Sequence, residues 1–138
     1  MTNFNDAKIT SLFVSQVASA GIQDDAPNAP AGGPFDVTLE MEAGTGLQTS
    51  DYTLIVSCED VTAVAAAPAL VPPAGALGGA GSFGTSSGWG TVNTFSATDP
   101  ITPDPATPPG HVYQYTAAVY SKNGQVVSSL QSDLFVLI

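Results

Sequence analysis

The sequence has little with which to build a catalytic or metal centre. It contains one cysteine, Cys58, and one histidine, His111, so neither an intrachain disulfide nor a zinc site of several Cys and His ligands can form. A serine nucleophile would depend on His111 as its base, and this residue follows Pro109-Gly110 at the expected start of a strand. We expect a solvated or capping histidine there, a buried and inert thiol at Cys58, and no enzymatic activity.

Positive charge is almost absent. Two lysines, Lys8 and Lys122, face twelve acidic residues, there is no arginine, and the formal net charge is −10. Nucleic-acid binding depends on Lys and Arg contacts to phosphate, and a strongly acidic surface repels polyanions and anionic lipids. We therefore expect no nucleic-acid partner, and a surface that owes its solubility to acidic and uncharged polar side chains.

Long apolar runs are also absent, and no segment approaches the roughly 18 apolar residues that a membrane span requires. The stretch from Leu12 to Gly21 ends in Ala18-Ser19-Ala20, which is similar to a signal-peptidase site, but Ser15 and Gln16 interrupt its apolar part. The sequence thus predicts a first strand here and no convincing signal peptide. It leaves the localisation open, with a virion or an extracellular particle as compatible places.

The composition favours one folded β domain. Hydrophobic residues make up 43% of the 138 residues, which disfavours disorder, and 14 glycines with 11 prolines disfavour long helices. A chain of this length can bury roughly two-thirds of its unfolded surface. We expect residues 1–138 to form a single β-sandwich domain.

Alternation with a period of two predicts the strands. Phe35, Val37, Leu39 and Met41 share one face, with Asp36, Thr38, Glu40 and Glu42 on the other. The residues from Tyr52 to Glu59 repeat the pattern, with Cys58 on the apolar face. Further strands are expected at about 8–18 and 89–97, and a hairpin at 112–121 and 125–138 around Lys122-Asn123-Gly124, whose Asn-Gly pair suits a tight type I′ turn. These elements predict an all-β, antiparallel, two-sheet sandwich.

The run from His111 to Gln125, with Tyr113-Gln114-Tyr115, Val119 and Asn123-Gly124, resembles the last hairpin of bacterial and phage immunoglobulin-like domains. The resemblance covers about the last third of the chain and implies an immunoglobulin-like sandwich. Members of this family usually act as binding, spacer, or capsid and tail decoration modules. The paired cysteines of antibody-type domains are missing, so the resemblance does not extend to them.

One long loop rich in Ala, Pro and Gly is expected at 61–87. It carries no charged residue after Asp60 but several apolar ones, and connections beyond about 15 residues are uncommon in compact domains. Two interpretations stay open: an irregular cover over one end of the sandwich, or a contact surface for a neighbouring subunit. The apolar chain end from Leu134 to Ile138 supports the second. The predicted partner-contact residues are Leu70, Val71, Leu77, Phe83, Phe135, Val136, Leu137 and Ile138.

No cofactor site is expected. The pairs Asp24-Asp25 and Glu59-Asp60 offer two carboxylates each, whereas calcium takes six to eight oxygen ligands, so only weak cation binding is left open at either pair.

We therefore expect a non-catalytic structural or interaction subunit that decorates or cements a larger assembly, such as a phage capsid, a tail or a related particle. Its partners would be other proteins or further copies of itself. The alternative is a module that binds glycans or cell surfaces by stacking sugar rings on aromatic side chains. The candidates for that role are Trp89, Tyr113, Tyr115 and Tyr120.

Overall fold

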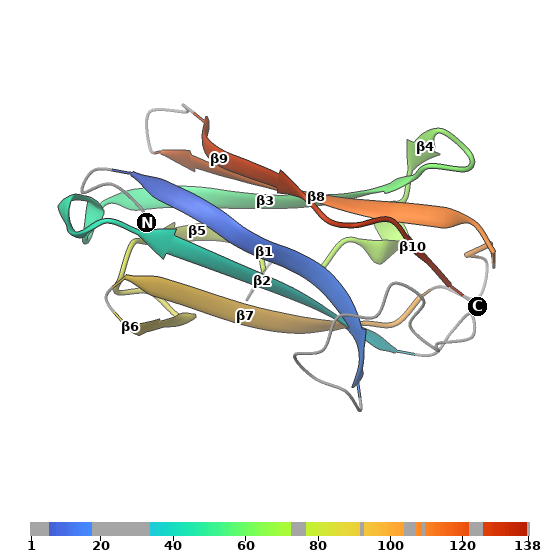
Figure 1. Ribbon diagram of the computed structural model, residues 1–138, viewed down its shortest axis with the longest axis horizontal. Coiled ribbons are helices and arrows are strands. Elements are labelled where there is room, and N and C mark those ends of the chain that lie inside the picture. Colours follow the sequence, from blue (N-terminus) through green and yellow to red (C-terminus); the bar gives the residue numbers. More distant parts are fainter. Residues whose placement is uncertain are drawn as a thin grey trace.

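The computed structural model describes residues 6–17, 34–72, 77–91, 93–103, 107–108, 110–121 and 126–137. Two antiparallel sheets face one another, and their strands run along the long axis of the molecule (Figure 1). This arrangement confirms the all-β sandwich that the sequence predicts. In the described part of the chain, no helix is long and apolar enough to cross a membrane.

The first sheet contains four strands in the order β1-β2-β7-β6. Strand β1 also contacts β9 of the other sheet, and the Ile9 backbone N–H donates to Ser128 Oγ at 3.0 Å, so β1 joins the two layers along one edge. The bounds are β1 (Ala7–Gln16), β2 (Phe35–Ala43), β6 (Trp89–Thr91) and β7 (Thr94–Ile101).

The second sheet is built on a central pair, β3 and β8, and both of its edges are broken into two segments. Along β8, β9 pairs with one end and β10 with the other; along β3, β5 and β4 pair in the same way. The bounds are β3 (Asp51–Asp60), β4 (Ala65–Ala66), β5 (Gly79–Ser82), β8 (Val112–Ser121), β9 (Val126–Gln131) and β10 (Phe135–Val136), with short 3-10 helices η2 (Thr45–Leu47) and η3 (Pro68–Leu70).

This strand order is that of an immunoglobulin-like sandwich. When each broken edge counts as one strand, the sheets read β1-β2-β7-β6 and β9/β10-β8-β3-β4/β5. These orders correspond to A-B-E-D and G-F-C-C′ of the immunoglobulin topology. The topology therefore agrees with the expectation drawn from the C-terminal hairpin.

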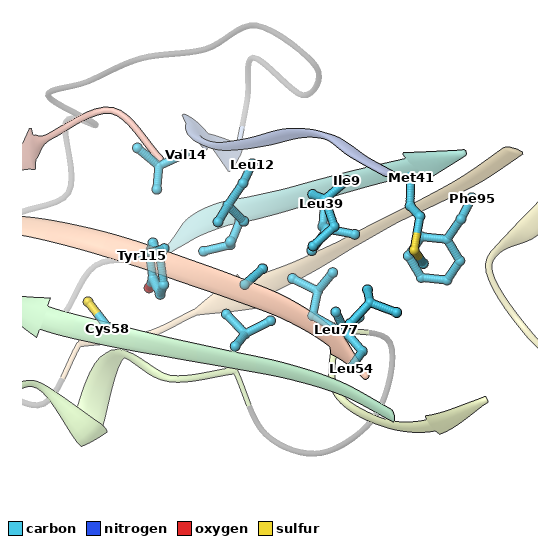
Figure 2. Packing of buried hydrophobic residues seen from close by; sticks show 14 of the residues in the cluster. Ile9, Leu12, Val14, Leu39, Met41, Leu54, Cys58, Leu77, Phe95 and Tyr115 are labelled. Atoms are coloured by element: carbon cyan, nitrogen blue, oxygen red, sulfur yellow. The ribbon is translucent and has the colours of Figure 1, made fainter. Parts of the chain in front are cut away.

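The core follows the alternation of the strands. On β3, Tyr52, Leu54, Val56 and Cys58 are buried, while the residues between them are exposed. Figure 2 shows Leu54 and Cys58 among the buried side chains of the core. Aromatic rings fill both ends of the core. Tyr115 and Phe135 stack at 5.4 Å with an interplanar angle of 8° at the end where β3 finishes, and Tyr52, Phe83, Trp89 and Phe95 meet at the other end.

Several boundaries differ from the sequence prediction. The expected strand at 89–97 is two antiparallel strands, β6 and β7, which bring Trp89 opposite Phe95. Gly88 permits this arrangement, because its φ is +99° and a Cβ there would lie 2.2 Å from the Phe95 ring. The last strand is interrupted between β9 and β10, and the Lys122-Asn123-Gly124 turn lies outside the described residues.

The outer face of β2 is less exposed than its polar pattern suggests. Asp36 is 9% exposed and Thr38 is 6% exposed, on a strand that has β1 and β7 on its two sides. The Thr38 hydroxyl shares a hydrogen bond of 2.8 Å with the Thr98 hydroxyl on β7. Alternation therefore identified the core face of β2 correctly but not the solvation of its other face.

Candidate functional site

The candidate site lies where β3 ends and β8 begins. Beyond the last ladder residue of β3, the Val61 N–H donates to Val112 O at 2.8 Å, and the Val112 N–H donates to Thr62 Oγ1 at 2.9 Å. These bonds hold residues 61–64, the β3–β4 turn, against the start of β8. The turn and the segment after it form an uncharged stretch from Val61 to Leu70 at this end of the sandwich.

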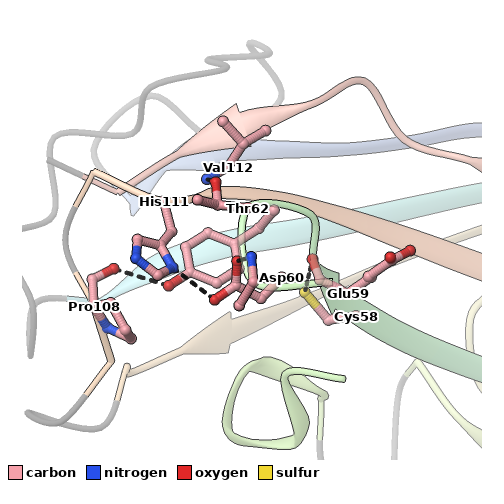
Figure 3. A network of polar contacts seen from close by, with 9 residues as sticks. Cys58, Glu59, Asp60, Thr62, Pro108, His111 and Val112 are labelled. Carbon is pink, nitrogen blue, oxygen red and sulfur yellow. Dashed lines mark hydrogen bonds and ion pairs between the residues drawn. The ribbon is translucent and has the colours of Figure 1, made fainter. Parts of the chain in front are cut away.

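An ion pair fixes the base of the turn (Figure 3). Asp60 Oδ2 lies 2.8 Å from His111 Nδ1, and Asp60 Oδ1 accepts the Ala63 N–H at 3.0 Å. The His111 ring also stacks on the Tyr113 ring at 6.5 Å, and the Tyr113 hydroxyl donates to Pro108 O at 2.9 Å. The carboxylate therefore joins two segments that are 51 residues apart in the chain.

The environment of Asp60 favours the ionised carboxylate. Desolvation is the largest single influence and would raise the pKa, but the hydrogen bond from His111, the N–H groups of Ala63 and Thr62, and the charge of His111 together outweigh it. The pKa of Asp60 consequently lies below its usual value of 3.8. Asp60 is thus an anion at neutral pH, with most of its acceptor positions occupied.

The β3–β4 turn presents an apolar side chain in an unfavourable backbone conformation. The Val64 φ is +53°, and its side chain is 82% exposed. Asp60 pairs with Ala65 across this hairpin, which leaves a four-residue loop whose last position is left-handed. Gly or Asn normally occupies such a position, whereas a β-branched residue there is a genuine outlier.

A pocket of about 290 Å³ opens beside the turn. Its walls are small or apolar, including Ala66, Pro68 and Leu70 from the segment after the turn and Pro108 from the opposite side. The ring of Tyr113 and the residue Asp60 complete the lining. Asp60 is the charged group among the described lining residues, so the pocket combines one carboxylate with apolar walls.

The structure places most of the predicted partner-contact residues in the protein's own core. Leu70 and Leu77 are 0% exposed, and Phe83, Phe135 and Leu137 are 1% exposed. Val71 and Val136 are half-buried, and Ile138 lies outside the described residues. In the folded monomer these five side chains belong to the hydrophobic core formed between the two sheets, and so they are not available to a partner. This placement favours the intramolecular cover for that part of the 61–87 loop.

Two features of this end were not recognised from the sequence. Alternation places Asp60 in the inward register of β3, and this was the available signal that its carboxylate needs a partner. The pairing with His111 itself depends on the register between β3 and β8. Val64 belongs to the uncharged loop, but the sequence alone does not indicate that Val64 is exposed while Leu70 is buried.

Two features of the described residues bear on nucleophilic chemistry. Burial raises the pKa of the Cys58 thiol to about 12, so the nucleophilic thiolate is scarce at neutral pH. The run 84–88 reads Gly-Thr-Ser-Ser-Gly, a Gly-x-Ser-x-Gly string, yet it forms a turn between two strands and not a strand-to-helix elbow. Ser86 Oγ donates to Ser82 O at 3.1 Å and lies near the opposite end of β3 from His111.

The Glu59-Asp60 pair does not bring its two carboxylates together. Glu59 is exposed on the outer face of β3, whereas Asp60 is buried and bonded to His111, so the two carboxylates diverge. Asp24 and Asp25 lie outside the described residues. Across the described ranges, no group of three His, Cys, Asp or Glu side chains could hold a metal ion.

The aromatic residues considered for sugar stacking are mostly internal. Tyr113 is 1% exposed and Tyr115 is 0% exposed, and Trp89 packs among Tyr52, Phe83 and Phe95. Tyr120 lies on the outer face of β8 and is half-buried. The described residues therefore do not present a row of aromatic faces to a glycan.

Comparison with known proteins adds information on the fold. No protein-family model matches the sequence, and no curated protein is significantly similar to it. Among solved structures, the chain is similar to a Niemann-Pick type C2 protein from the Japanese carpenter ant, with a TM-score of 0.56 and 6% identity over 99% of this chain and 96% of that one. The major pilin subunit of Bacillus cereus matches with a TM-score of 0.48 and 12% identity over 96% of this chain and 40% of the pilin. At such low identity the first similarity shows a shared β-sandwich fold alone.

Proposed function

We propose that this protein is a non-catalytic interaction subunit that attaches to a protein partner through the uncharged segment from Thr62 to Ala69. We propose further that this partner is a component of a larger assembly, such as a phage capsid, a tail or a related particle. The observation that carries the proposal is Val64, an exposed β-branched residue held at a φ of +53°.

Val64 contributes little to the stability of the monomer. Its side chain is 82% exposed, so it gains little from burial, while a left-handed conformation costs an L-residue about 1–2 kcal/mol. Strained residues persist where the surroundings determine them, and they cluster at ligand-binding and contact sites. A partner that covers Val64 would supply the apolar contact that the isolated domain lacks.

The surroundings of Val64 suit a preformed contact. Ala63, Ala65, Ala66, Pro68 and Ala69 are exposed, and none of them carries charge. Short side chains lose little rotamer entropy on binding, and the Asp60 and Thr62 hydrogen bonds already fix the turn. Binding through this segment would therefore require little ordering.

The test compares charge at two strained, exposed positions. Val64→Glu places a carboxylate in the proposed contact, and Thr49→Glu does the same at a φ of +68° near the start of β3, at the opposite end of the sandwich. Each tagged variant is expressed in the native source, and the proteins that co-purify are quantified by mass spectrometry. We expect Val64→Glu to lose the partner recovered with the unmodified chain while Thr49→Glu retains it, with equal melting temperatures. Equal recovery by both variants would refute the proposed contact.

A further inference from the structure

We infer that the pocket beside Asp60 accepts a lysine side chain of the protein partner. This inference rests on the proposed function, and it names the chemistry by which the partner is recognised. The pocket wall formed by Ala66, Pro68 and Ala69 belongs to the same segment that carries the proposed contact, so a partner seated on the turn also covers the pocket.

The charge of the pocket selects a cation. Asp60 lies in the lining, its pKa is lowered, and most of the residues around it are apolar, so a cationic group in the pocket meets a carboxylate beside apolar walls. The chain as a whole has a formal net charge of −10, which favours the approach of a basic partner.

The hydrogen bonds of Asp60 distinguish lysine from arginine. A carboxylate has about four lone-pair positions, and N–H groups of His111, Ala63 and Thr62 occupy three of them. Arginine binds carboxylates best through two parallel bonds, for which both oxygens must be free on one side. The ammonium of lysine needs a single acceptor and can use the remaining position.

The size and lining of the pocket suit one side chain. At about 290 Å³ it lies at the lower limit of ligand pockets, which span roughly 300–1,000 Å³. The four-carbon stem of lysine is apolar and can lie along the alanine and proline walls, beside Leu70 and Tyr113, which also line the pocket. A drug-sized ligand would extend well beyond these walls.

The experiment is an NMR titration of the full chain with Nα-acetyl-lysine methylamide. Two matched probes separate these features. The norleucine analogue keeps the apolar stem without the charge, and the arginine analogue keeps a positive charge with a different head group. We expect the lysine probe to shift the amide signals of Ala66, Ala69 and Leu70, with a dissociation constant on the order of millimolar. Both other probes should bind at least about threefold more weakly.

Two variants test the assignment of the site. Asp60→Asn should remove the preference for lysine over norleucine. Since this change also alters the bond to His111, Ala69→Leu provides a second test, because it narrows the mouth of the pocket from an exposed position and should weaken lysine binding without lowering the melting temperature. The inference would be overturned by equal binding of lysine and norleucine, by shifts confined to Asp36, Glu40 and Glu42 of β2, or by full binding to Ala69→Leu.

The two proposals fail separately. Loss of the partner in Val64→Glu without lysine binding in the pocket would leave the proposed function standing and refute the lysine pocket. Lysine binding together with full partner recovery by Val64→Glu would refute the role of the turn, and the pocket would then belong to a contact that does not involve Val64.

Discussion

Replacing Val64 with glycine should stabilise the domain and weaken its binding to a partner. The φ of +53° costs valine about 1–2 kcal/mol, and glycine adopts this region freely. The side chain is 82% exposed, so its removal forfeits little burial. The greater backbone freedom of glycine stabilises the unfolded state by about 0.5–1 kcal/mol, which offsets part of the gain. The net expectation is a stabilisation of about 0.5–1 kcal/mol.

Thr49→Gly is the matched control. Thr49 is also β-branched, exposed and left-handed, with a φ of +68°, and its N–H still donates to Phe83 O after the change. Both variants should therefore gain similar stability. The position at the opposite end of the sandwich means that Thr49→Gly should leave partner binding unchanged.

Urea unfolding followed by circular dichroism measures both variants. For a domain of this size, the expected gain corresponds to a rise in melting temperature of about 2–4 °C. An unchanged m-value would show that each variant exposes as much surface on unfolding as the unmodified chain does. A loss of more than about 0.5 kcal/mol in Val64→Gly, with the control stabilised, would refute the argument, because it would mean that the valine side chain makes stabilising contacts within its own domain.

Other parts of the core make further predictions. Tyr115→Phe removes a buried hydroxyl that donates to the η3 carbonyl of Leu70 at 2.6 Å, and should cost about 1–3 kcal/mol in urea unfolding; a cost below about 0.5 would show that this bond does not hold η3. Leu54→Asp should cost several kcal/mol and abolish the cooperative transition, whereas Thr53→Asp on the exposed face should change stability by less than about 0.5 kcal/mol; similar losses would contradict the register of β3. The pKa of Asp60 is lowered from 3.8 in the folded state, so its ionised carboxylate stabilises the fold at pH values above 3.8. This stabilisation is lost as the pH falls through the pKa of the folded state. The unmodified chain should thus lose more stability than Asp60→Asn between pH 5 and pH 2, and parallel pH profiles would contradict this. Cys58, with a pKa of about 12, should react with a thiol reagent at pH 8 only in denaturant, and rapid labelling of the native protein would contradict its burial.

The sequence predicted the strands whose alternation is regular. On β3 and β8 every second residue is buried, including Tyr52 and Tyr115, because a pleated strand between two neighbours must direct alternate side chains to the core. The Gly and Pro content was enough to exclude long helices. These local properties fix the fold class without reference to contacts between distant segments.

The tertiary structure alone decided which residues of the uncharged loop are buried. Leu70, Leu77 and Phe83 are buried while Val64 is exposed, although all four stand in the same stretch of apolar and small residues. Their burial depends on whether the chain folds back onto β3 and the aromatic rings at either end of the core. No periodicity in the segment records that outcome.

The candidate site shows the same division between local and distant information. The inward register of Asp60 is readable from β3, but its partner His111 is 51 residues away and comes into reach only because β3 and β8 pair in one register. The left-handed conformation of Val64 likewise follows from the pairing of Asp60 with Ala65, and not from any preference of valine. The sequence alone thus determined which residues could be buried, charged or strained, and the pairing of distant strands decided which of them meet.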